Sequence, residues 1–290
     1  MNFEISLSNA TKSLDGLSVG DAFGELFFRF SPFETAFEEL PTTPWKWTDD
    51  THMALSIVEI LKIHHRIEQD ELAKAFARRY SQEPYRGYAG GAHRLLGKIA
   101  LGANWRDLAP TLFGNGSYGN GGAMRAAPIG GFFHEDLNQA ANEAELSAEV
   151  THAHPEGKAG AVAVAVAAAV ATHRPYPTGN DFLRAVLLYV PDGITRARIE
   201  EAMQIPADAV LDAMRILGAG EKVSAQDTVP FCLWSAAHHM NNYEAALWNT
   251  VKGLGDVDTT CAIVGGIVAL SAPQIPEVWL ARREPLNDER

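Results

Sequence analysis

The sequence predicts an all-α protein, with residues 1–290 forming one domain. Apolar residues recur at helical spacing in most segments, and Gly, Asn and Pro gather in the stretches between them. Little of the chain shows the alternation of apolar and polar residues that is typical of strands. No linker rich in Pro or Ser divides the chain, and no repeat of fixed length is visible. We expect only the charged tail, from about residue 283, to be loose.

The first helical segments follow from this periodicity. Residues 13–28 are apolar and rich in small residues, and residues 51–65 have helical spacing. Residues 70–82 are amphipathic, with their apolar side chains on one side of a helix. Residues that cap helix N-termini precede three such runs, so we expect N-caps at Ser8, Asp70 and Asp136.

Residues 159–172 consist almost entirely of Ala, Val and Gly. This run is shorter than the roughly 18 apolar residues that a membrane span needs, and alanine favours helix over strand. We therefore expect a central helix that other helices cover on all sides. The best strand candidate, residues 185–190, also lies in a helical pattern. Residues 243–255 indicate a helix that ends at a glycine turn.

Composition narrows the classes of partner. The net charge of −12 argues against nucleic acid or an anionic membrane as the main partner, because both would be repelled. Cys232 and Cys261 lie in apolar helical segments, as expected for buried free thiols in a reducing compartment. The first residues have neither a basic region nor an apolar core, so no signal peptide is predicted. We expect a cytoplasmic protein.

Two acidic motifs stand at the start of apolar helical runs. The first is "WTDDT", in which Asp49 and Asp50 are adjacent between two threonines. The second is "GDVDTT", which contains Asp256 and Asp258. Carboxylates are favoured at a helix N-terminus, so two ordinary capping clusters are the structural alternative.

A metal site is the functional interpretation of these motifs. If both helix starts face one cleft, their carboxylates cannot all stay ionised without cations. The ligand set is all oxygen, which suits hard ions, and four carboxylates suit two Mg²⁺ or Mn²⁺ ions. "DVDTT" also matches a phosphatase nucleophile motif, but that motif needs a preceding buried strand. An EF-hand loop needs further acids and a Gly that are missing here.

A third feature is the glycine-rich stretch "FGNGSYGNGG" of residues 113–122. Glycine lets backbone N–H groups approach phosphate oxygens closely, and Tyr118 could stack on a purine. The stretch matches no named phosphate-binding motif, and a flexible surface loop is the alternative. His152 and His154 follow in "THAHPEG", where each on its own is more often structural than catalytic.

Taken together, the segments resemble the ADP-ribosylglycohydrolase family, of the dinitrogenase-reductase-activating type. The resemblance spans nearly the whole chain, from "GLSVGDAFGE" through "WTDDT", "RGYAGG", "GNGSYGNGGAMRAAPIG" and "THAHPEGKAG" to "GDVDTTCAIVGG". It implies a compact orthogonal bundle of helices with two Mg²⁺ or Mn²⁺ ions. It also implies hydrolysis of the glycosidic bond between ADP-ribose and a protein or small-molecule acceptor.

The resemblance also implies roles for individual positions. The implied metal ligands are Thr48, Asp49, Asp50, Asp256, Asp258 and Thr259. The implied substrate-binding residues are Gly116, Ser117, Tyr118, Gly119, Asn120, Gly121 and His152. The loop would hold the diphosphate and face the adenosine side of ADP-ribose.

Departures from the family pattern concern the acid after "GDAFG". Many relatives carry Glu seven residues after the Asp, where this chain has Phe28, and the nearby acid is Glu25. We therefore treat Glu25 as a catalytic candidate whose role is open.

The usual "GGD" of the second motif is here Leu254-Gly255-Asp256. "RGYAGG" is more similar to the branch that acts on O-linked ADP-ribose, which slightly favours serine or O-acetyl linkages over arginine.

The leading hypothesis is a hydrolase in which the ions fix and activate a water. Asp50 or Asp258 would accept the proton of that water. A non-catalytic ADP-ribose-binding or regulatory protein on the same scaffold is the alternative that the missing Glu keeps open. A phosphohydrolase that uses "DVDTT" is the third hypothesis. We expect a monomer with no nucleic-acid partner.

Overall fold

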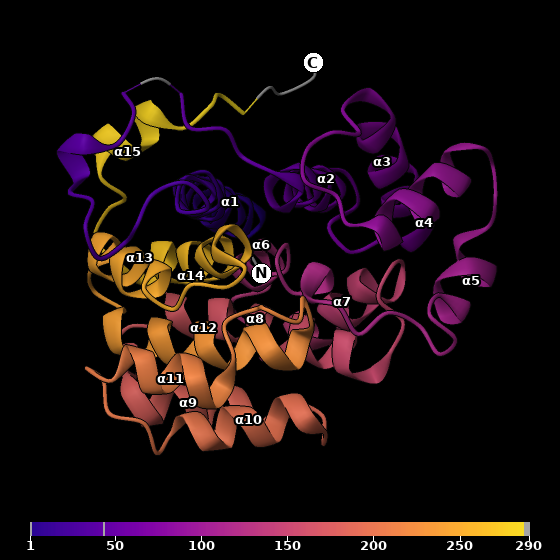
Figure 1. The fold of residues 1–290 in the computed structure, drawn as a ribbon. Helices are drawn as coiled ribbons and strands as arrows, with labels where there is room; N and C mark the ends of the chain where they lie inside the picture. Colours follow the sequence, from indigo (N-terminus) through magenta and orange to yellow (C-terminus); the bar gives the residue numbers. More distant parts are fainter. Residues whose placement is uncertain (1, 43, 287–290) are drawn as a thin grey trace.

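Helix α1 (Phe3–Leu26) and helix α14 (Val257–Ser271) pack side by side at the centre of the molecule (Figure 1). The computed structural model describes residues 2–42 and 44–286. A Cβ atom on Gly20 would lie 2.1 Å from the carbonyl oxygen of Cys261, and one on Gly16 would meet α14 equally closely. Glycine therefore permits the close approach of the two backbones. This packing brings the two ends of the sequence together.

The regular structure of the described residues consists of α-helices and short 3₁₀ turns, with only two isolated β-bridges besides them, so the predicted all-α class is confirmed. Besides α1 and α14, the α-helices are α2 (Asp49–His64), α3 (Gln69–Gln82), α4 (Gly90–Ala100), α5 (Trp105–Leu108), α6 (Ala127–Phe132), α7 (Leu137–Glu149), α8 (Pro155–Thr172), α9 (Gly179–Leu187), α10 (Ile194–Ala202), α11 (Val210–Leu217), α12 (Ala225–His239), α13 (Tyr243–Val251) and α15 (Glu277–Arg282).

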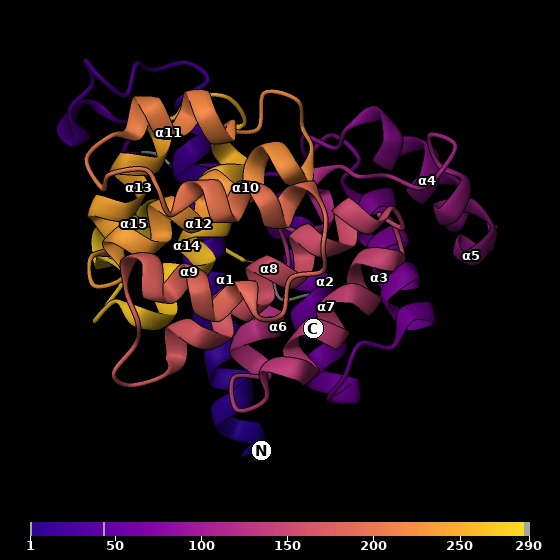
Figure 2. The ribbon, with the colours of Figure 1, turned by 90° about the horizontal axis from the view of Figure 1, so that it is seen from below.

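The other helices are arranged around this central pair. The helices α8 and α12 pack on α14, and α6 packs on both α1 and α8. The helices α9, α10 and α11 cover α12 on the side away from α1 (Figures 1 and 2). On the opposite side α2 packs on α1, α3 on α2 and α4 on α3, so that α4 and α5 form one edge of the molecule in both views.

The alanine- and valine-rich run is the helix α8, as predicted. From Ala159 to Ala171 its residues are buried, because α6, α7, α12 and α14 surround it. No helix in the described residues combines the length and the apolar character that crossing a membrane requires. Cys232 and Cys261 are buried free thiols, as expected.

Only one of the three predicted N-caps is correct. Asp136 caps α7 by accepting a hydrogen bond from the backbone N–H of Gln139. The helix α1 instead begins earlier than Ser8, with Asn2 as its cap, and α3 begins at Gln69 after Glu68. Polar residues inside a helix resemble caps in the sequence, and packing decides where the helix begins.

The tail was predicted to be loose from about residue 283, and this is wrong for Arg283 and Glu284. The backbone N–H of Glu284 donates to the carbonyl oxygen of Trp45 at 2.8 Å, beside a β-bridge between Trp45 and Arg283. The Glu284 carboxylate also accepts a 2.7 Å hydrogen bond from Arg86. These contacts hold the tail against the segment that leads into α2. Residues 287–290 lie outside the described residues.

Candidate functional site

The first acidic motif forms the N-terminus of α2. Thr48 is the N-cap, and its hydroxyl lies 3.1 Å from a carboxylate oxygen of Asp50. Asp49 and Asp50 occupy the first turn, where free backbone N–H groups favour negative charge. The capping alternative therefore describes this motif correctly, but it accounts for Thr48 better than for the buried carboxylate of Asp50 or the half-buried one of Asp49.

Asp21, on α1, fixes the first turn of α2 through hydrogen bonds. Its carboxylate accepts hydrogen bonds from the backbone N–H and hydroxyl of Thr48, and from the backbone N–H and hydroxyl of Thr51. The distances lie between 2.5 and 3.0 Å. Asp21 is fully buried, so these hydrogen bonds replace the water that its carboxylate loses on folding.

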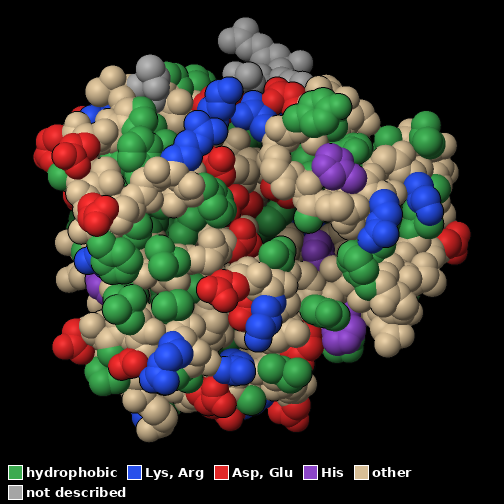
Figure 3. All heavy atoms as spheres, viewed as in Figure 1, with side chains coloured by type: hydrophobic (Ala, Val, Ile, Leu, Met, Phe, Trp, Pro, Cys, Tyr) green, Lys and Arg blue, Asp and Glu red, His purple; other side chains and the backbone are tan. Residues whose placement is uncertain are grey.

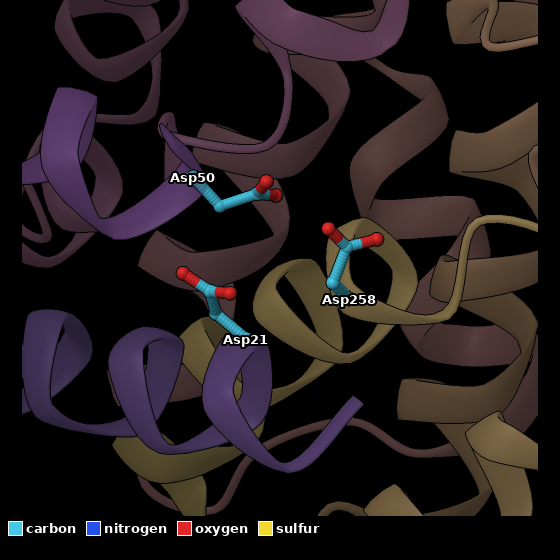
Figure 4. A group of neighbouring side chains, drawn as sticks. All are labelled: Asp21, Asp50 and Asp258. Atoms are coloured by element: carbon cyan, nitrogen blue, oxygen red, sulfur yellow. The ribbon is translucent and has the colours of Figure 1, made fainter. Parts of the chain in front are cut away.

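The second motif enters from α14, which begins one residue after its N-cap Asp256. One carboxylate oxygen from each of Asp21, Asp50 and Asp258 lies within 4.8 Å of the others. Figure 4 shows the three side chains pointing toward one another from three separate helices. The two motifs, about two hundred residues apart in the sequence, therefore meet at one place, which is the condition on which the metal-site interpretation depended.

The remaining members of the two motifs lie around this centre. The Thr259 hydroxyl lies 3.4 Å from a carboxylate oxygen of Asp50, which joins the second motif to the first. The side-chain amide of Asn120 donates to Asp256 at 2.7 Å. Asp49 lies beside Gly87, where an added Cβ would come within 3.0 Å of its carboxylate. The glycine-rich loop and the "RGY" segment thus both contact the acidic centre.

The electrostatics of the centre are those of crowded buried acids. Burial, and then the charge of Asp258, raise the pKa of Asp50 well above its usual range. Burial, and then the charge of Asp256, do the same for Asp258. Burial, and then the Asp21 charge, raise the pKa of Asp49 to about 8. For Asp21, burial raises the pKa to about 6 although its hydrogen bonds oppose the shift.

These residues fit divalent cations. The Oδ1 atoms of Asp50 and Asp258 are buried and have no hydrogen-bond partner in the described residues. Buried carboxylate oxygens without a donor are costly unless a proton or a cation neutralises them. Oxygen ligands of this kind are the ones that Mg²⁺ and Mn²⁺ prefer.

A cavity of about 500 Å³ opens over this centre. Figure 3 shows it as a hollow near the middle of the face, with acidic side chains on one side and a histidine on the other. Among the six predicted metal ligands, Thr48 alone does not line it. The lining also includes Ser117, Tyr118, Gly119, Asn120, Gly121 and His152.

The glycine-rich loop is held by the N-terminus of α12 and its N-cap residue. The backbone N–H of Ala225 donates to the carbonyl oxygen of Tyr118 at 2.9 Å, and a β-bridge joins Gly119 to Ser224. Gly116 does not line the cavity. It has a φ of 86°, and an added Cβ would lie 2.6 Å from the backbone nitrogen of His154. This glycine therefore shapes the loop.

Glu25 is not among the residues that line the cavity. It is half-buried near the end of α1, where burial raises its pKa and Arg29 opposes the shift. The position at which many relatives carry Glu is occupied here by Phe28, which lies just beyond the helix and is 55% exposed.

Sequence reasoning missed several residues of the site. Asp21 was used only to count the distance to the missing Glu, although an acid amid small apolar residues was a usable signal. Lys222 and Val223 line the cavity from a loop that carried no signal. Arg125 was also missed, because an arginine inside "GAMRAAP" gives no indication that its guanidinium is buried.

Three comparisons place the chain among known proteins. A family model described as ADP-ribosylglycohydrolase matches residues 4–289. Human ADP-ribosylhydrolase ARH3 is 26% identical over 324 residues, which cover 94% of this chain and 88% of that protein. An uncharacterized protein of Archaeoglobus fulgidus is 30% identical, covering 91% of this chain and 88% of its own.

The fold is also found among solved structures. A chain described as an ADP-ribosylglycohydrolase-related protein complex superposes with a TM-score of 0.70 at 22% identity, covering 97% of this chain and 94% of that chain.

Proposed function

The chain belongs to the ADP-ribosylglycohydrolase family and is a glycosyl hydrolase, and we propose that it cleaves the bond between ADP-ribose and an O-linked acceptor. The observation that carries this proposal is the convergence of Asp21, Asp50 and Asp258 from three helices, with Asp50 and Asp258 in the wall of one cavity. The glycine-rich loop lines the same cavity. Acid residues and a loop suited to phosphate thus face the same space.

We propose that two Mg²⁺ or Mn²⁺ ions bind at this centre. The proposed ligands are Thr48, Asp49, Asp50, Asp256, Asp258 and Thr259, of which all but Thr48 line the cavity. Asp21 differs from them, because hydrogen bonds from Thr48 and Thr51 already occupy both of its oxygens. When bound, such ions polarise the ribose hydroxyls and the attacking water.

The roles proposed for the acids follow from their free oxygens. Asp50 or Asp258 would accept the proton of the water, because each has a buried Oδ1 atom that no donor in the described residues occupies. Glu25 is proposed only as an assisting acid, since it lies outside the cavity lining. Hydrolysis places a hydroxyl on the anomeric carbon of ribose and returns the acceptor with its proton.

The loop would hold the diphosphate and adenosine. Ser117 to Gly121 line the cavity, with His152 beside them, and are the part of the loop that would contact the diphosphate. Gly116 would shape the loop from outside the cavity. Tyr118 is 49% exposed, and its ring packs edge-on against His154 at 5.4 Å between centroids. That exposed ring is available to stack on a purine.

The preference for an O-linked acceptor rests on "RGYAGG". Gly87 adjoins Asp49, so this segment borders the acidic centre, where the acceptor would leave. The hydroxyl of Tyr88 is bound to His52 at 3.0 Å, which fixes the segment.

We also propose a cytoplasmic monomer that acts on ADP-ribosylated proteins or small molecules without a nucleic-acid partner. The acidic net charge of −12 supports that last point.

A panel of substrates tests the proposal. Arginine-, serine- and acetyl-linked ADP-ribose would be incubated with the enzyme in Mg²⁺, Mn²⁺ and EDTA, and the free acceptor measured. We expect turnover with a divalent ion, fastest on an O-linked substrate, and none in EDTA. Asp50→Asn and Asp258→Asn should each abolish it, whereas Asp212→Asn, an exposed aspartate of α11, should not.

Wild-type rates in both site variants would overturn the proposed roles. The absence of Glu at position 28 favours one other candidate, a non-catalytic ADP-ribose-binding protein. Calorimetry with ADP-ribose separates the two: tight binding without turnover on any linkage would support the binding protein.

A further inference from the structure

Arg125 lies beneath the glycine-rich loop with its side chain fully buried. Its Nη1 atom donates to the carbonyl oxygen of Gly121 at 2.8 Å, and its Nη2 atom donates to the hydroxyl of Thr151 at 2.8 Å. In the part of the chain that the structure describes, no carboxylate forms an ion pair with it. The guanidinium instead lies 4.4 Å from the centroid of the Phe76 ring. A buried cation held this way points to a role beyond charge pairing.

The contact between Arg125 and Thr151 determines the direction of the hydrogen bond between Thr151 and His152. A guanidinium only donates, so the Thr151 oxygen accepts from Arg125. The same Thr151 oxygen lies 2.7 Å from Nδ1 of His152. Among the described residues, the Thr151 hydroxyl forms hydrogen bonds with Arg125 and His152 alone, and only Nδ1 of His152 can accept its proton. The hydroxyl therefore donates to Nδ1, and the imidazole proton must be on Nε2.

The Nε2 atom of His152 faces the glycine-rich loop at the cavity wall. A Cβ atom on Gly119 would lie 3.2 Å from it, and one on Gly121 would lie 2.9 Å from it. The two glycines thus leave the space in front of Nε2 open. Burial, and then the charge of Arg125, lower the pKa of His152 to about 3, so the ring is neutral near pH 7.

We propose that Arg125 is a positioning residue that acts through Thr151 to hold His152 as the Nε2–H tautomer. His152 then presents one fixed hydrogen-bond donor to an oxygen of the ligand in the loop, and it takes no part in proton transfer. The same guanidinium fixes Gly121, so the donor and the loop backbone are set by one side chain. The ligand part of this inference rests on the proposed function, whereas the tautomer part does not.

Nitrogen-15 NMR of the full-length, ligand-free protein tests the tautomer directly. We expect the His152 signals, assigned by their loss in His152→Asn, to show a protonated Nε2 and an unprotonated Nδ1. Thr151→Val removes the hydroxyl with little change in shape and should give a mixture of tautomers. Thr151→Ser keeps the hydroxyl and should restore the wild-type pattern. Arg125→Lys keeps the positive charge but lacks the two nitrogens that donate to Gly121 and Thr151. If this variant folds, it should also give a mixture of tautomers.

The same variants are then titrated with ADP-ribose. Thr151→Val should weaken binding about fivefold to tenfold, the effect of one misdirected hydrogen bond, and Thr151→Ser should restore affinity. A proton on Nδ1, an imidazolium at pH 7, or a Thr151→Val spectrum identical to wild type would overturn the inference. Normal tautomers and affinities without turnover would instead overturn the proposed hydrolysis alone.

Discussion

Asp21 shows how one buried side chain organises the site. Both of its oxygens accept hydrogen bonds from Thr48 and Thr51, so it ties the N-terminus of α2 to α1. A carboxylate can satisfy four donors, whereas an amide cannot, because half of its capacity is donors. The position of Asp50 therefore depends on a residue of another helix.

We predict that Asp21→Asn destabilises the protein and impairs metal binding together. At least one backbone N–H would face the new amide group, at a cost of about 1–3 kcal/mol. Urea unfolding gives the stability, and the shift in melting temperature on adding Mg²⁺ gives the binding. Ser56→Ala on α2 is the control, because that buried hydroxyl has no partner in the described residues. A stability loss with the metal-induced shift fully preserved would contradict a positioning role for Asp21.

At the scale of elements, the glycines between α1 and α14 set the distance between Asp21 and Asp258. Gly20 contacts the backbone of α14 so closely that any side chain must push the helices apart. Asp21 follows Gly20 directly, and an added Cβ on Gly24, one turn further along α1, would lie 2.8 Å from the Cα atom of Asp258, so the separation of the two carboxylates follows from this packing.

Gly20→Ala should cost about 1–3 kcal/mol through overpacking and should reduce turnover as well. Gly97→Ala is the matched control, because its Cβ would meet its nearest neighbour, Tyr80, at 3.9 Å. Inside α4 that change should stabilise the protein by about 0.5–1 kcal/mol. Calorimetric melting and turnover measure both effects. Equal stability of the two variants would refute the close-packing argument.

A second prediction at this scale concerns the N-terminus of α10, which has no side-chain cap of its own. The Glu156 carboxylate accepts hydrogen bonds from the N–H groups of Ile194 and Thr195 and from the Thr195 hydroxyl. Burial alone would raise the pKa of Glu156, but these hydrogen bonds lower it below 4.5. A lowered pKa means that the carboxylate stabilises the fold above pH 4.5 and loses this effect as pH falls through the folded pKa.

Glu156→Gln should therefore cost about 1 kcal/mol at pH 7, and the difference from wild type should shrink below pH 4.5. Urea unfolding at several pH values measures it. Glu244→Gln, an exposed residue in the first turn of α13, should change stability little at any pH. A difference between Glu156→Gln and wild type that grew toward low pH would have the wrong sign for this mechanism.

At the scale of the whole molecule, the acidic centre joins helices from both ends of the chain. The wild-type protein without ions carries repelling buried acids at the contact of α1, α2 and α14. Divalent ions that bind only the folded state should stabilise it, by about 2.7 kcal/mol at a hundredfold excess over the dissociation constant.

We expect Mg²⁺ or Mn²⁺ to raise the melting temperature of the wild-type protein and EDTA to reverse the rise. In Asp258→Asn the rise should disappear, while the ion-free variant should melt above the ion-free wild type because one of the mutually repelling acids is gone. Differential scanning calorimetry measures both. An undiminished rise in Asp258→Asn would show that the ions bind elsewhere.

Patterns local in the sequence were sufficient for the class of fold and for much of the site. Helical periodicity predicted the all-α architecture, and the composition of residues 159–172 predicted the buried helix α8. The two acidic motifs and the glycine-rich loop were recognisable as segments, because their residue types carry their chemistry wherever they lie. Their convergence on one cavity was a conditional expectation that the structure then supplied.

Only the tertiary structure decided the contacts between residues that are far apart in the chain. Asp21 became the support of α2, Arg125 became the buried donor to Thr151, and Glu284 closed onto the segment before Thr48. Each of these side chains takes its role from its partners, and spacing along a helix does not identify partners on another helix. The sequence by itself therefore determined which groups carry chemistry, and packing determined which groups hold them in position.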